Sequence, residues 1–203
     1  MARIVFSNMP HHIVQRGNRR QDVFFEDEDR EIYLRLLKEQ IQKYEVQVWA
    51  YCLMSNHVHL IVVPANKDSL AKAIGETHKR YTRMINFREG WRGYLWEGRF
   101  KSFLLDEKYV YAAVRYVERN PARVKIVKRA EDYPWSSAKA HIKRLNGTVL
   151  SDFYLLDEIA DWSDYLRQED KEEDLKIFRR HGSVGKPIGD AKFIKRTRIN
   201  QFN

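Results

Sequence analysis

The sequence predicts an α+β fold in which helices pack on one face of an antiparallel sheet. Two β-type runs are separated by only three residues, which is typical of a hairpin, and three longer stretches repeat apolar residues at helical spacing. Along the chain the elements follow the order β-α-β-β-α-β-α. That order, with neighbouring strands antiparallel, is typical of a ferredoxin-like sandwich.

The first predicted elements are a short strand and a helix. A β-type run at 13–15 ends in a turn marked by Gly17 and Asn18 and crowded with arginines. The acidic stretch EDED at 26–29 then suits the positive end of a helix dipole. The inward face of this helix is predicted to carry Tyr33, Leu36, Leu37, Ile41 and Tyr44.

The predicted hairpin joins the run VQVWAYCL at 46–53 to the run HVHLIVV at 57–63. Side chains alternate between the two faces of a strand, so His57, His59, Ile61 and Val63 share one face. Val58, Leu60 and Val62 share the other face. The two imidazoles are therefore neighbours in space.

Three further elements complete the prediction. A helix at 69–87 turns Leu70, Ile74 and Tyr81 inward, and the segment 90–105 supplies a loop and a strand. The last helix begins at Asp106, a good N-cap residue, and runs to about Asn120. We expect it to end there, because the residue before a proline, here Pro121, disfavours the helical conformation.

Length and composition indicate a folded protein with two parts. The 203 residues are 43% hydrophobic and 32% charged, which excludes wholesale disorder. Beyond residue 150 an acidic helix leads to a glycine-rich loop and a basic end. We therefore expect a main domain at 1–150 and a C-terminal helical and basic region of uncertain role at 151–203.

The net charge of +9 favours a polyanionic partner, with nucleic acid first among the candidates. The single cysteine, Cys52, excludes an intramolecular disulfide and a cysteine-rich zinc site, and is compatible with a reducing compartment. No apolar stretch approaches the length of a membrane span. We expect a cytoplasmic, nucleoid-associated protein with no membrane partner.

Two small clusters of residues could carry chemistry. Two neutral imidazoles on one sheet face, those of His57 and His59, can converge on one divalent metal ion, although an H-x-H pair can also be purely structural. Tyr116 and Asn120 are four residues apart and share a helical face, where the alternative is a packing tyrosine and a helix cap. His12 could be a further polar contact near the site or a structural histidine.

Four ordered blocks between about residues 10 and 145 carry a family resemblance: HHIVQRGNRRQDVFF, SNHVHLIV, YLWEGRFKSFLLDEKYVYAAVRYVERNPARV and DYPWSSAKAH. In sequence and spacing they resemble the single-tyrosine HUH transposases, most closely the REP-associated tyrosine transposase branch. The resemblance implies a ferredoxin-like (RRM-like) catalytic core that cleaves and rejoins single-stranded or hairpin DNA. It also implies a divalent cation, Mg²⁺ or Mn²⁺, and a chain that acts as a monomer or a homodimer.

The resemblance assigns roles residue by residue. His57 and His59 match the metal ligands, Asn120 matches the polar residue that completes the metal site, and Tyr116 matches the nucleophile that forms a 5′-phosphotyrosine. Basic residues interleaved with aromatic ones suit single-stranded DNA, which binds in positive grooves with stacking platforms. The predicted DNA contacts are Arg16, Arg19, Arg20, Lys79, Arg80, Arg83, Arg99 and Lys101.

Two other functions compete with a transposase-like enzyme. The same fold could be a non-catalytic module that binds repeat DNA or RNA. The presence of His57, His59, Tyr116 and Asn120 together disfavours that alternative. A zinc hydrolase is the third interpretation, but the sequence lacks an H-E-x-x-H motif or a nearby pair of carboxylate ligands.

Overall fold

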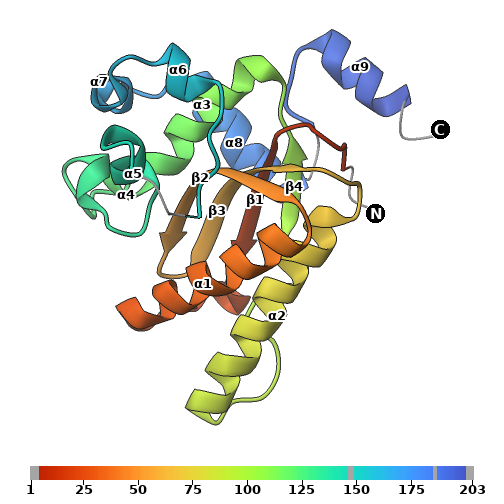
Figure 1. Ribbon diagram of the computed structural model, residues 1–203, viewed down its shortest axis with the longest axis vertical. Coiled ribbons are helices and arrows are strands. Elements are labelled where there is room, and N and C mark those ends of the chain that lie inside the picture. The colour runs from red at the N-terminus through yellow and green to blue at the C-terminus, as the bar shows by residue number, and fades with distance from the viewer. Residues whose placement is uncertain (1–4, 146–148, 185–186, 200–203) are drawn as a thin grey trace.

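The computed structural model describes residues 5–145, 149–184 and 187–199 and has a four-stranded antiparallel sheet at its centre (Figure 1). The strands lie in the order β2-β3-β1-β4, which confirms the predicted α+β fold. The strands are β1 (His11–Arg16), β2 (Val46–Met54), β3 (His57–Pro64) and β4 (Lys101–Leu104). The helices are α1 (Asp27–Lys43), α2 (Ser69–Glu89), α3 (Glu107–Glu118), α4 (Asn120–Arg123), α5 (Ala138–Ile142), α6 (Leu155–Glu158), α7 (Trp162–Arg167), α8 (Glu172–Val184) and α9 (Ala191–Ile199), with short 3-10 turns at Asn18–Arg20 and Ala130–Asp132.

Strand β3 lies inside the sheet, between β1 and β2. Its pairing places His59 opposite Val14 on one side and Cys52 on the other. Val58, Leu60 and Val62 point to one face and pack with α1 and α2, whereas Ile61 packs on the opposite face. The predicted alternation is confirmed, so the two histidines lie on the face opposite α1 and α2.

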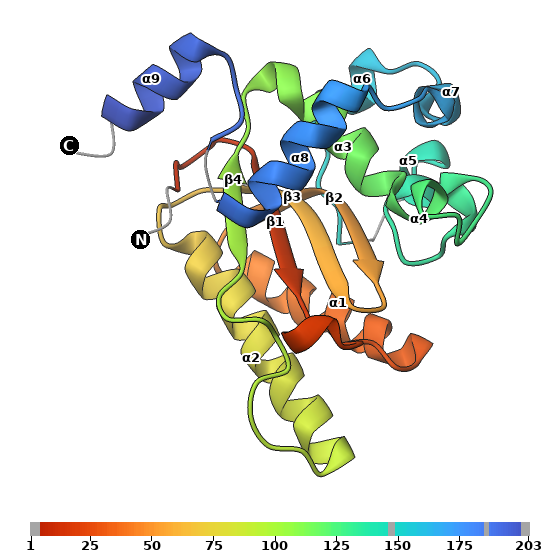
Figure 2. The same ribbon diagram turned by 180° about the vertical axis from the view of Figure 1, so that it is seen from behind.

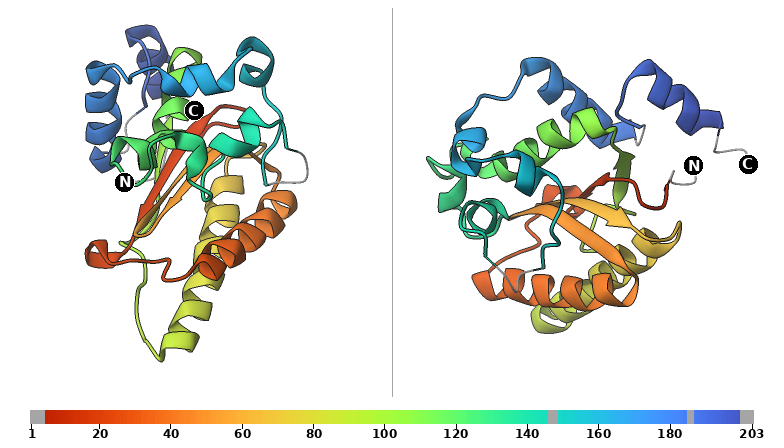
Figure 3. Two further views of the ribbon diagram at one scale, coloured as in Figure 1. Left: turned by 90° about the vertical axis from the view of Figure 1, so that its left-hand side faces the viewer. Right: turned by 45° about the horizontal axis from the view of Figure 1, so that its top comes forward.

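Helices α1 and α2 cover one face of the sheet and bury a core that includes Tyr33, Leu37, Ile74 and Tyr81 (Figure 3, right). The acidic first turn of α1 forms a capping box, in which the side chain of Asp29 accepts hydrogen bonds from the backbone N–H groups of Phe25 and Glu26, just before the helix. The same carboxylate pairs with Arg88 at the far end of α2, with a closest N···O distance of 2.5 Å.

The predicted sandwich had helices on one face, but here helices lie on both (Figures 1 and 2). On the second face, apolar side chains such as Ile61 and Phe103 are buried in a separate core, and α3 and α8 help to cover this face. Val114 of α3 is fully buried there. Burying this face removes apolar surface from water, which explains why the sheet takes a second layer.

Helix α3 ends at Glu118, close to the predicted stop at Asn120. After a one-residue break, α4 adds a further turn with Pro121 in its first turn. A proline is tolerated there because the first N–H groups of a helix have no intrahelical partner. The stop predicted at Pro121 is therefore a break of one residue, and it leaves Asn120 at the junction of the two helices.

A buried polar network holds α3 in place. The Glu118 carboxylate is fully buried and accepts hydrogen bonds from Ser137, from Nδ1 of His141 at 2.6 Å and from Nε1 of Trp162 at 2.8 Å. These partners come from the approach to α5, from α5 itself and from α7. A buried carboxylate that accepts several hydrogen bonds fixes the elements that supply the donors.

None of the helices in the described ranges is long and apolar enough to cross a membrane.

Candidate active site

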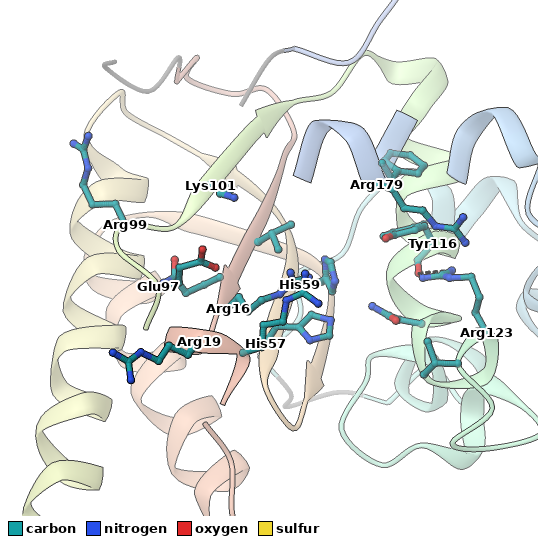
Figure 4. A pocket seen from close by; sticks show the side chains of 16 residues that line it. Arg16, Arg19, His57, His59, Glu97, Arg99, Lys101, Tyr116, Arg123 and Arg179 are labelled. Atoms are coloured by element: carbon teal, nitrogen blue, oxygen red, sulfur yellow. Dashed lines mark hydrogen bonds between the residues drawn. The ribbon is translucent and has the colours of Figure 1, made fainter. Parts of the chain in front are cut away.

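A cleft of about 780 Å³ opens on the histidine-bearing face of the sheet (Figure 4). Its walls come from β1, β3, the segment before β4, the α3–α4 junction and α8. The lining residues are Val14, Gln15, Arg16, Arg19, Arg20, His57, His59, Glu97, Arg99, Lys101, Tyr116, Asn120, Arg123, Val124, Phe178 and Arg179. The structure thus brings Tyr116, Asn120 and both histidines of the H-x-H pair to one cleft.

His57 is held in a single orientation by its neighbour. Its Nδ1 lies 2.6 Å from Oδ1 of Asn56, whose Nδ2 donates to the carbonyl of Arg20 at 3.2 Å. Because that Asn56 oxygen can only accept, Nδ1 of His57 carries the proton and Nε2 keeps a lone pair. Burial, reinforced by the charge of Arg16, lowers the pKa of His57 to about 4, so the ring is neutral at pH 7.

His59 is also neutral and contacts a third imidazole. Burial is the main cause that lowers its pKa well below 6.5, and the nearby His57 and His12 add to it. Its Nδ1 lies 2.9 Å from Nε2 of His12, and the two rings stack with centroids 5.1 Å apart. When His59 donates this hydrogen bond, its own Nε2 is left with a lone pair. His12 is therefore a buried polar contact of the candidate ligand.

Tyr116 extends from α3 toward these histidines (Figure 4). Its ring centroid is 5.8 Å from that of His59 and 6.1 Å from that of His12. The ring is 9% exposed, with Phe178 of α8 at a centroid distance of 4.9 Å and the Arg123 guanidinium 4.0 Å from its centroid. The tyrosine is thus confined between an aromatic ring and a cation.

Arg123 connects Tyr116 to the C-terminal region. Its guanidinium donates two hydrogen bonds of 3.1 Å to the Tyr116 carbonyl and pairs with Asp170 at 3.2 Å. The Asp170 carboxylate is 7% exposed and also pairs with Arg115 at 3.4 Å and Arg119 at 3.3 Å. One carboxylate therefore gathers three arginines that flank the tyrosine.

Asn120 lies at the α3–α4 junction, is 5% exposed and lines the cleft. Within the described part of the chain its side chain makes no hydrogen bond, so its amide oxygen is available. Two neutral imidazoles and an amide oxygen fit a divalent cation, and imidazole favours Mn²⁺ over Mg²⁺. Among the described residues, no group of three His, Cys, Asp or Glu side chains could hold a metal.

The predicted DNA contacts fall into two groups. Five of them line the cleft, namely Arg16, Arg19, Arg20, Arg99 and Lys101. The other three, Lys79, Arg80 and Arg83, lie on α2, and no side chain of α2 lines the cleft. Lys79 pairs with Glu76 at 3.5 Å and Arg80 with Glu39 at 2.5 Å. Helix α2 packs on the sheet face opposite the histidines, which explains the separation.

The sequence reasoning did not single out Arg123, Asp170 or Phe178. A signal for Arg123 was present, because it belongs to the RYVERNPAR block and follows Tyr116 by seven residues, which is two helical turns. Asp170 and Phe178 lie far along the chain, in the region where the family resemblance was weak. Their contacts with Arg123 and Tyr116 arise only from tertiary packing.

Both the sequence and the fold of this chain are similar to those of known proteins. Residues 5–120 match the family model described as Transposase IS200 like. A Haemophilus influenzae protein described as a REP-associated tyrosine transposase is 26% identical over 117 residues, which cover 52% of this chain and 66% of that protein. The solved structure of a REP-associated tyrosine transposase bound to a REP hairpin aligns with a TM-score of 0.61 and 19% identity, over 75% of this chain and 93% of that one. The family match spans more than half of the sequence, and the chain therefore belongs to the IS200-like transposase family.

Proposed function

We propose that this protein is a metal-dependent single-stranded DNA endonuclease and strand transferase that acts through a 5′-phosphotyrosine intermediate. The observation that carries the proposal is the position of Tyr116, which faces the neutral His57 and His59 within one basic cleft. Membership of a transposase family supports DNA as the substrate. The related structure bound to a REP hairpin supports hairpin or repeat DNA as its form.

The proposed reaction exchanges one phosphoester for another. The Tyr116 hydroxyl oxygen attacks the scissile phosphorus and the bond from phosphorus to the 3′-oxygen breaks. The proton that the tyrosine hydroxyl loses is balanced by the proton that the 3′-oxygen gains as it leaves as a 3′-OH. The product is a 5′-phosphotyrosyl protein. Because a phosphoester is conserved, attack by another 3′-OH reverses the step and joins strands without an external energy source. No nucleotide cofactor is required.

The residues of the cleft have separate tasks in this proposal. His57, His59 and Asn120 would hold a divalent cation, which supplies positive charge that polarises the scissile phosphate. Arg123 and Phe178 confine the Tyr116 ring, so that its hydroxyl is presented to the cleft. A fixed nucleophile avoids the entropic cost of orienting it in the transition state. Arg16, Arg19, Arg20, Arg99 and Lys101 would neutralise the DNA backbone.

The active site is proposed to be complete in one chain. Tyr116 and both histidines belong to the same molecule and line the same cleft, so a partner need not supply the nucleophile. We place the chemistry in the 1–150 domain. The 151–203 region is proposed to be accessory, since its Asp170 and Phe178 contact Arg123 and Tyr116.

The test is a covalent-adduct assay. Wild-type protein is incubated with a labelled single-stranded hairpin oligonucleotide, taken from the DNA that flanks its own gene, in the presence of Mn²⁺ or of EDTA. We expect a protein–DNA adduct on a denaturing gel with Mn²⁺ and none with EDTA. Binding of the same oligonucleotide without any adduct would refute the enzymatic proposal and favour the non-catalytic binding module.

A further inference from the structure

Exposed aromatic side chains gather at one place outside the cleft. Among the described residues, five large aromatic side chains are exposed, and four of them are Phe25 (42%), Phe87 (90%), Trp91 (45%) and Tyr94 (86%). Phe87 lies in the last turn of α2, Trp91 and Tyr94 follow in the loop toward β4, and Phe25 lies two residues before the start of α1. We call these four residues the aromatic arm.

The aromatic arm lies on a projecting part of the molecule. The end of α2 and the loop after it extend beyond the sheet, and the loop then returns to β4 (Figure 2). Gly90 and Gly93 have φ angles of +67° and +100°, a backbone conformation that favours glycine, and they bend the chain around Trp91. Within the part of the chain that the structure describes, no helix or strand covers this end, so its rings are open to a partner.

The loop is nevertheless held in one conformation. The N–H of Trp91 donates to the Asn86 carbonyl at 2.8 Å, and the Asn86 side chain donates to the Gly93 carbonyl at 3.0 Å. The Trp91 ring meets Phe25 edge to face at a centroid distance of 5.6 Å. The arm is therefore a preformed surface, and binding to it requires little ordering of the backbone.

The aromatic arm is joined to the cleft and is basic. The N–H of Asn18 donates to the Leu95 carbonyl, and the N–H of Glu97 donates to the Arg16 carbonyl, both at 2.8 Å. The loop that begins at the arm thus packs against the turn that carries Arg19 and Arg20. In the described part of the chain, Arg83 and Arg92 are exposed and make no ion pair, and they lie in the same projecting segment.

Exposed rings together with unpaired arginines fit a nucleic acid strand. Apolar patches on a protein surface mark interaction sites, and single strands bind to aromatic rings by base stacking within a positive groove. Aromatic residues and arginine also occur at protein interfaces. The net charge of +9 and the junction with the basic cleft favour DNA here.

We propose that the aromatic arm is a stacking platform for unpaired bases of the DNA strand that enters the cleft. This inference rests on the proposed function, because it assumes that the cleft binds single-stranded DNA. The platform would hold bases of the strand outside the cleft, and its contribution would be insensitive to base identity because every base has a π face.

The test measures DNA binding in the presence of EDTA, so that the readout does not depend on cleavage. The probe is a fluorescein-labelled single-stranded oligothymidine, and the readout is fluorescence anisotropy. We expect the double variant Phe87→Leu/Tyr94→Leu to bind about tenfold more weakly, whereas Tyr94→Phe keeps the ring and binds like wild type. The matched control is Tyr111→Leu, an exposed tyrosine on α3 outside the arm, which should bind like wild type. Thermal melting checks that each variant is folded.

An abasic oligonucleotide separates stacking from charge. On an oligomer of the same length without bases, wild type and the double variant should bind equally. The proposal is overturned if the double variant binds oligothymidine as wild type does, if it is equally weakened on the abasic oligomer, or if wild type does not bind the strand at all. It is also overturned if the variant instead disrupts a homodimer in sedimentation. If no covalent adduct forms but the double variant still binds oligothymidine more weakly than wild type, only the proposed chemistry is contradicted.

Discussion

Replacing Arg123 with alanine tests whether this arginine positions the nucleophile. The substitution removes the guanidinium that lies 4.0 Å from the centroid of the Tyr116 ring and both hydrogen bonds to the Tyr116 carbonyl. It also removes one of three arginines from Asp170, while Arg115 and Arg119 remain. The Asp170 charge therefore stays paired, and the loss falls mainly on Tyr116.

The magnitude follows from these contacts. Hydrogen bonds to a charged group are worth roughly 1.5–3 kcal/mol, and a partly buried cation–π contact adds about 1 kcal/mol. We expect Arg123→Ala to lower the free energy of unfolding by about 2–4 kcal/mol. If about 1.4 kcal/mol of that contribution is also needed to orient the ring, the rate of adduct formation at saturating DNA falls about tenfold.

Urea denaturation measures the first effect and single-turnover adduct formation measures the second. Arg119→Ala is the matched control, because it removes another Asp170 partner without touching the Tyr116 ring. Arg123→Lys keeps the charge but loses the planar, two-pronged contact, so it should form adduct at an intermediate rate. Equal adduct rates in Arg123→Ala and Arg119→Ala would refute the positioning role.

Three further predictions concern stability and DNA binding. Burial lowers the pKa of His11 to about 4, so the unfolded chain binds the extra proton as the pH falls from 6.5 toward 4. Through this residue, the free energy of unfolding should drop by about 2 kcal/mol between pH 7 and pH 5, and the drop should be smaller in His11→Gln. Urea denaturation at several pH values measures it, and an equal drop in both proteins would contradict this prediction. A Cβ on Gly17 would lie 2.2 Å from the Gln21 carbonyl oxygen, so Gly17→Ala should lower the melting temperature, and an unchanged value would show that the turn can shift. Arg19→Ala should weaken DNA binding and reduce its dependence on salt by about one counterion, whereas Arg80→Ala on α2 should not; equal salt slopes would show that the cleft does not bind the backbone.

The face shared by His57 and His59 could be predicted from sequence because strand alternation is a local property. A period of two decides which side chains share a face, whatever the rest of the chain does. The helical spacing of apolar residues, also a local property, placed the ends of α2 within two residues. Local patterns of this kind depend on neighbours in the chain, and the structure confirms them.

The surroundings of Tyr116 could not be predicted in this way. Phe178 and Asp170 follow Tyr116 by more than fifty residues, and only packing brings them to Arg123 and the tyrosine ring. The position of the basic residues on α2 relative to the cleft could not be predicted from sequence either. Helical spacing shows that Lys79 points away from the apolar stripe, but it does not show which face of the sheet the helix covers.

The central claim is that Tyr116 forms the covalent bond to DNA. The most direct measurement is to trap the adduct with a labelled hairpin and Mn²⁺, digest the protein and identify the modified peptide by mass spectrometry. We predict that the phosphotyrosyl linkage maps to Tyr116, that Tyr116→Phe binds the hairpin but gives no adduct, and that Tyr109→Phe and Tyr111→Phe still give one. An adduct that persists in Tyr116→Phe, or a linkage at another residue, would contradict the account.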